Sequence, residues 1–99
     1  MSPQPDLREA RKQLEAERKK RDREAQALQK RIADLEGRIA EREAQVKELE
    51  GLMATAGFFD DRNGSKEVVD RHQALMWEVG DLIAQWEALQ EHAQHAQGS

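Results

Sequence analysis

Two runs of apolar residues at heptad spacing, separated by a short segment of turn-forming residues, constrain the fold of this 99-residue chain more than any other feature. The first run alternates steps of four and three residues, with one seven-residue step across Arg42: Leu28, Ile32, Leu35, Ile39, Val46, Leu49 and Met53. The second run keeps the alternation throughout: Val68, His72, Leu75, Val79, Leu82, Trp86 and Leu89. This is the spacing of the a and d positions of a coiled coil. The sequence therefore predicts two helices that pack along one apolar seam.

The segment between the runs predicts a reversal of the chain. Gly57, Asn63 and Gly64 favour turns, and Ser65 is a suitable N-cap for the helix that follows. Two apolar stripes joined by a short turn fold back on each other. The predicted fold class is all-α, an antiparallel two-helix coiled-coil hairpin with an extended basic N-terminal helix. The expected facing pairs are Met53 with Val68, Leu49 with His72, Val46 with Leu75, Ile39 with Leu82, Leu35 with Trp86, and Ile32 with Leu89.

The expected organisation is a single domain. Pro3 and Pro5 oppose a helix before Asp6, which is a suitable N-cap. The predicted elements are a disordered N-terminus over 1–6, a long helix over 7–54, a turn over 55–65, a second helix over 66–95 and a disordered tail over 96–99. Because the second helix ends first, residues 7–24 should continue as a helix without an intramolecular partner. We expect Phe58 and Phe59 to plug the apolar end of the hairpin and Met76 to widen the seam.

Charge is distributed unevenly along the chain. Residues 7–31 hold ten Lys or Arg against five Asp or Glu, whereas residues 51–99 hold three against eight. One interpretation of the basic stretch is a solvated helix with ion pairs such as Glu15–Lys19 and Glu17–Arg21. The other is a surface that binds phosphates, with an affinity that falls steeply with salt. The candidate phosphate-binding residues are Arg18, Lys19, Lys20, Arg21, Arg23, Lys30 and Arg31.

Catalytic chemistry is not indicated. Cysteine is absent, and Asn63-Gly64-Ser65-Lys66 lacks the spacing of a phosphate-binding P-loop. His92 and His95 have no third ligand nearby and favour a solvated helix end over a metal site. A two-helix hairpin also offers no enclosed pocket. We therefore expect no catalytic residue, no cofactor, no metal and no enzymatic activity. No apolar run is long enough for a membrane span, and the expected compartment is the cytoplasm.

Several short motifs, in order, resemble the C-terminal coiled-coil extension of the ABC-F ATP-binding cassette proteins, and among them the Uup-like group. The resemblance covers about Leu14 to Gln90. It is carried by Glu17-Arg18-Lys19-Lys20, Ile32-Ala33-Asp34-Leu35-Glu36 with Ile39, Leu49-Glu50, Phe58-Phe59-Asp60 and Trp86-Glu87-Ala88-Leu89. Two features depart from that family. Ala56-Gly57-Phe58 stands where the family turn often has a proline before its aromatic residue, and the second helix is acidic.

The resemblance implies an excised domain that follows the second nucleotide-binding domain of a soluble, non-transporting ATPase. Such proteins act on ribosomes and translation, and in the Uup-like group this domain binds DNA. The implied partners are nucleic acid, either DNA or ribosomal RNA, and the parent ATPase domains in cis. The acidic second helix moves the expected contact to residues 8–31. The alternative is a protein-interaction or spacer coiled coil that self-associates through Leu7 and Leu14 on the unpaired part of the first helix.

Overall fold

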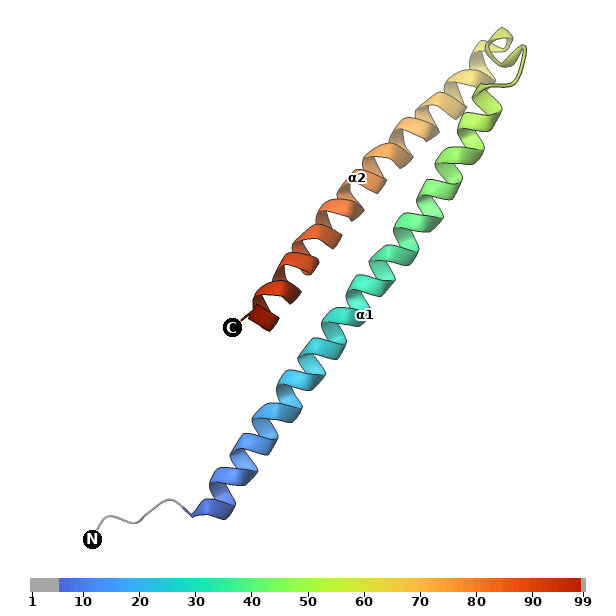
Figure 1. The fold of residues 1–99 in the computed structure, drawn as a ribbon. Coiled ribbons are helices and arrows are strands. Elements are labelled where there is room, and N and C mark those ends of the chain that lie inside the picture. Colours follow the sequence, from blue (N-terminus) through green and yellow to red (C-terminus); the bar gives the residue numbers. More distant parts are fainter. Residues whose placement is uncertain (1–5, 99) are drawn as a thin grey trace.

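The computed structural model describes residues 6–98, which form two long antiparallel helices joined at one end (Figure 1). Helix α1 spans Leu7–Met53 and helix α2 spans Arg62–Gly98, with the short 3-10 helix η1 at Phe58–Asp60 between them. Within residues 6–98 there is no β-strand. The predicted fold class, an all-α helical hairpin, is confirmed. Residues 1–5 and Ser99, which belong to the predicted disordered ends, lie outside the described residues.

Helix α1 begins at a side-chain cap. Asp6 adopts an extended conformation, and its carboxylate accepts a hydrogen bond from the Arg8 N–H at 3.0 Å. This satisfies one of the N–H groups that have no partner in the first turn of a helix. The helix then runs for 47 residues, about 70 Å at 1.5 Å per residue. Gly37 and Gly51 lie within it without interrupting it.

The turn ends α1 and starts α2 earlier than the sequence indicated. Gly57 has a φ of 81°, in the left-handed region that glycine tolerates best. Asp61 is extended and caps α2, because its Oδ1 accepts the Gly64 N–H at 3.3 Å. Helix α2 therefore begins at Arg62, not residue 66, and it continues to Gly98, not 95. Ser65, the predicted N-cap, is instead buried, and its hydroxyl donates to the Arg62 carbonyl at 3.2 Å.

The core is the predicted seam between the two helices. Its buried apolar side chains are Ile32, Leu35, Val46, Leu75, Val79, Leu82 and Ala93. Leu28, Ile39, Leu49, Met53, Val68, Trp86 and Leu89 are half-buried along the same seam. Two expectations were wrong. Met76 lies off the seam and is 51% exposed, and Phe59 is 64% exposed while only its edge-to-face neighbour Phe58 is half-buried.

Polar contacts across the seam agree with the predicted register. The Arg42 Nε donates to Glu78 Oε1 at 2.7 Å, and the Trp86 Nε1–H donates to Glu36 Oε2 at 3.3 Å. The His72 Nε2 lies 3.4 Å from Glu50 Oε1. Each of these pairs is within one position of the facing pairs expected from the heptads. The sequence pattern thus specifies both the direction of the second helix and its alignment on the first.

Candidate nucleic-acid interface

The N-terminal part of α1 extends beyond the end of α2 (Figure 1). We call residues 7–24 the projecting segment. All of its residues except Ala10 are exposed, including Leu7 at 74% and Leu14 at 64%. The segment holds eight Lys or Arg against five Asp or Glu. It therefore presents a net positive helix to solvent, and the positive end of the helix dipole lies at its start.

All seven predicted phosphate-binding residues are exposed, but they do not form one patch. Successive residues of an α-helix are rotated by about 100°, so the run Arg18-Lys19-Lys20-Arg21 surrounds the helix. On this geometry Arg21 lies toward the side on which α2 packs, and Arg18 and Arg31 flank that side. Lys19, Arg23 and Lys30 lie on the opposite side, and Lys20 lies in between. A single ligand surface therefore reaches only a part of the predicted set.

Arg18 is engaged by two carboxylates. Its Nη2 lies 2.8 Å from Glu15 Oε1, and its Nη1 lies 3.3 Å from Asp22 Oδ2. The hydrogen bond from Arg18, together with its charge and that of Lys19, lowers the pKa of the Glu15 carboxyl. The same hydrogen bond and the two carboxylate charges raise the pKa of Arg18. Glu15 thus makes its close contact with Arg18 and not with Lys19, the predicted partner, and much of the Arg18 charge is compensated locally.

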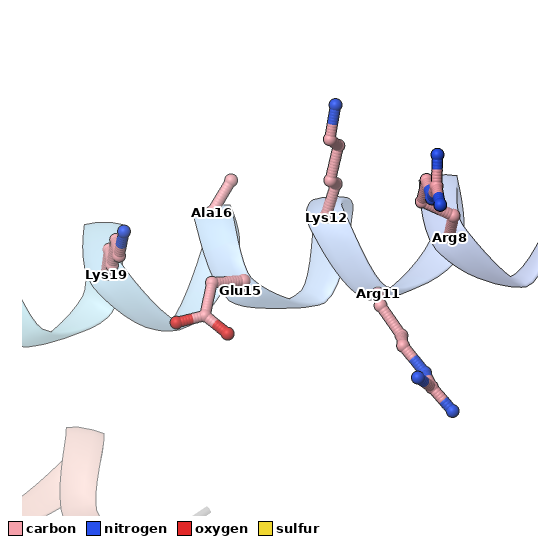
Figure 2. A pocket seen from close by; sticks show the side chains of 6 residues that line it. All are labelled: Arg8, Arg11, Lys12, Glu15, Ala16 and Lys19. Atoms are coloured by element: carbon pink, nitrogen blue, oxygen red, sulfur yellow. The ribbon is translucent and has the colours of Figure 1, made fainter.

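Arg8 and Lys12 were left out of the predicted site, although they belong to the same basic stretch. They line an open surface of α1 together with Arg11, Glu15, Ala16 and Lys19. Figure 2 shows the Arg8, Lys12 and Lys19 side chains on one side of the helix, and Arg11 and Glu15 directed to the other. The four-residue step from Arg8 to Lys12 and the seven-residue step to Lys19 were the sequence signal that could have grouped them.

A second hollow, of about 640 Å³, lies where α2 ends beside α1. Its apolar wall is the end of the seam, formed by Ala25, Leu28, Leu89 and Ala93. Arg18, Arg21 and Arg31 line the same hollow, together with Asp22 and Glu24. The structure therefore divides the predicted cations between this hollow and the opposite side of α1.

The C-terminal histidines, His92 and His95, are exposed near the end of α2. His95 Nε2 lies 3.7 Å from Glu91 Oε1, and both side chains are exposed. In the part of the chain that the structure describes, no three potential ligands from His, Cys, Asp and Glu come together as a cation site. Neither helix has, over that part, an apolar stretch that could cross a bilayer.

A comparison with protein families matches residues 18–91 to the ABC transporter C-terminal domain. The chain belongs to this family. The match covers the turn and most of both helices, and it includes every one of the seven predicted phosphate-binding residues. No curated protein and no solved structure shows significant similarity to the chain. Three basic residues of the ABC transporter C-terminal domain chain described here, Arg8, Arg11 and Lys12, precede the matched range.

Proposed function

We propose that this chain is a non-catalytic, nucleic-acid-binding accessory domain of a soluble, cytoplasmic ATPase of the ABC-F group, of the Uup-like kind. It contacts the phosphates of DNA or structured RNA through α1, and the parent ATPase domains lie in cis. The observation that carries the proposal is the exposed projecting segment with its excess of cations. Membership of the ABC transporter C-terminal domain family supports an accessory role beside ATP-binding domains.

The charge distribution supports a polyanion as the ligand. Helix α2 ends beside the last residues of the projecting segment, so the acidic residues of α2 do not screen most of that segment (Figure 1). No aromatic residue lies among the cations of α1, so base stacking does not contribute. Binding is therefore driven by release of counterions from phosphates and does not depend on base sequence.

The test is a titration of the chain into a labelled branched DNA and into an RNA hairpin, followed by fluorescence anisotropy. With about five to seven phosphate contacts, affinity should fall by roughly 500-fold to 6,000-fold between about 50 and about 200 mM salt. A variant with the seven predicted cations changed to Gln should lose most of its affinity and of its salt dependence. Unchanged binding by that variant would reject the proposal. The control changes three cations near the turn, Lys47, Arg62 and Lys66, to Gln and should bind as the wild type.

A protein-docking role is the second candidate, and one observation favours it. Trp77 is 70% exposed on α2, next to Met76, which is 51% exposed. Exposed tryptophan is typical of the centre of protein interfaces. Self-association through the projecting segment is less favoured, because antiparallel pairing of two copies about residue 16 places Arg11 against Arg21. Sedimentation at several concentrations checks this, since a mass that stays monomeric argues against a dimer.

A further inference from the structure

Five cations of α1 recur in a regular order. Arg8, Lys12, Lys19, Arg23 and Lys30 are separated by steps of four, seven, four and seven residues. At about 100° per residue they fall within an arc of about 60° around the helix. The acidic residues between positions 8 and 30 all fall outside this arc. We call these five residues the cationic stripe.

The stripe faces away from the rest of the molecule. Leu28 and Leu35, which mark the side of α1 that packs on α2, lie about 160° to 180° from Arg8 around the helix. All five cations are exposed, and Figure 2 shows the Arg8, Lys12 and Lys19 side chains on the same side. Among the described residues, no ion pair includes any of the five, whereas Arg18 has two. The stripe therefore keeps its charge available along its whole length, even at Lys30 beside α2.

The stripe is straight and has a repeat along the helix axis. From Arg8 to Lys30 it extends about 33 Å, at 1.5 Å per residue. Its pairs Arg8–Lys12 and Lys19–Arg23 recur after eleven residues, and so does Lys30 after Lys19, which is a repeat of about 16.5 Å. In a nucleic-acid duplex each strand crosses a line parallel to the axis once per turn of about 34 Å. The second strand crosses the line in between, at unequal intervals because the minor groove is narrower than the major groove. A stripe of about 33 Å therefore spans the crossings of about one turn.

We propose that the cationic stripe is a duplex-binding surface that lies along the axis of double-stranded nucleic acid and contacts successive backbone crossings. This rests on the proposed function and assigns its contact face. Arg8–Lys12, Lys19–Arg23 and Lys30 each contact one crossing, so a complete site spans about one turn of duplex. Lys20, Arg21 and Arg31, which face other directions, and Arg18, which is paired with carboxylates, contribute little. Single strands are poorer ligands, because the stripe has no aromatic side chain on which unpaired bases stack.

The experiment compares two triple variants with equal charge. The stripe variant carries Arg8→Gln, Lys12→Gln and Arg23→Gln. The off-stripe variant carries Arg11→Gln, Lys20→Gln and Arg31→Gln. All six positions are exposed, Gln resembles Arg and Lys in helix propensity, and each variant loses three positive charges. Circular dichroism should show the same helix content in both. Binding is measured by anisotropy with a labelled 16-base-pair duplex and the corresponding single strand, at several salt concentrations.

For the wild type and the off-stripe variant, log affinity against log salt should have a slope of about −4.5 on duplex, the value for five phosphate contacts. For the stripe variant the slope should fall to about −2, with a loss of affinity of more than about tenfold. Equal losses in the two variants would reject the stripe and leave the proposed function standing. Wild-type binding to the single strand as tight as to the duplex would reject the duplex as the ligand. Absence of any wild-type binding would reject the proposed function itself.

Discussion

The Arg42 Nε lies 2.7 Å from Glu78 Oε1 and connects the two helices at the position where the first heptad run lacks an apolar residue. The Arg42 side chain is 25% exposed and the Glu78 side chain 39%. The hydrogen bond to Glu78, more than its charge, raises the pKa of the Arg42 guanidinium. A cation at a d position thus finds its partner on the facing helix, and in other alignments of the two helices it would lack this partner.

Replacing Glu78 should therefore weaken the hairpin. Glu78→Gln removes a charged acceptor and leaves Arg42 half-buried beside a neutral amide, so the midpoint of urea unfolding should fall. Glu87→Gln, on the exposed surface of the same helix, removes the same charge and serves as the control. Circular dichroism at 222 nm follows both. A Glu78 variant as stable as the Glu87 variant would show that the contact does not stabilise the fold.

Leu75 should be the most sensitive position of the core. It is 1% exposed, and Leu75→Ala should lower the free energy of unfolding by about 2 to 5 kcal/mol, because it removes buried methyl groups and leaves a cavity. The adjacent Met76 is 51% exposed, and Met76→Ala should change stability by less than about 0.5 kcal/mol. Urea unfolding of both variants measures the difference. Similar values for the two would mean that the seam does not pass through Leu75.

Glycine-to-alanine substitutions should raise the stability of the protein in the helix and lower it in the turn. An added Cβ at Gly37 or Gly51 meets no atom of the described residues within 4 Å, outside the helix's own backbone, so each change to Ala should stabilise by about 1 kcal/mol. Gly57→Ala should destabilise by roughly 1 to 2 kcal/mol, since φ is 81° and the Cβ would lie 3.2 Å from Asp60 Oδ2. Thermal unfolding tests all three. Stabilisation by Gly57→Ala would contradict the left-handed turn.

The Glu15–Arg18 contact should make the projecting segment sensitive to acid. Since the pKa of Glu15 is lower in the folded helix than its ordinary value of 4.5, this contact stabilises the helix at pH above that value. The stabilisation is lost as pH falls through the lowered folded pKa. A titration of the Glu15 side-chain carbon by NMR measures this pKa directly. In the variant Arg18→Gln the pKa should rise toward its ordinary range, and an unchanged value would contradict the assigned pair.

The heptads were sufficient to predict the hairpin and its register, because a seam of a and d residues leaves each helix only one side to bury. The start of α2 was not predictable in the same way, since Asp61 and Ser65 are both suitable caps. Phe59 was assigned to the interior from its hydrophobicity alone, but the turn exposes it. Its neighbour Phe58 takes the half-buried position.

The candidate site was predictable as a segment but not as a surface. Composition located the basic stretch, and adjacency in sequence grouped Arg18 with Lys19, Lys20 and Arg21. On a helix, adjacency separates side chains and the steps of four and seven unite them. The local compensation of Arg18 depends on side-chain conformations of Glu15 and Asp22 that the sequence does not specify. To determine that the cationic stripe faces away from the hairpin, the position of α2 was also needed.

The unbroken length of α1 makes the hairpin a lever. Helix α1 runs without a kink from Leu7 to the turn, so the two ends move together as parts of a stiff rod. At a length of about 70 Å, a rotation of roughly 8° about the Leu7 end displaces the turn by about 10 Å, the width of one helix. A small rotation at the basic N-terminal end of α1 therefore produces a large displacement of Phe59 in the turn at the other end.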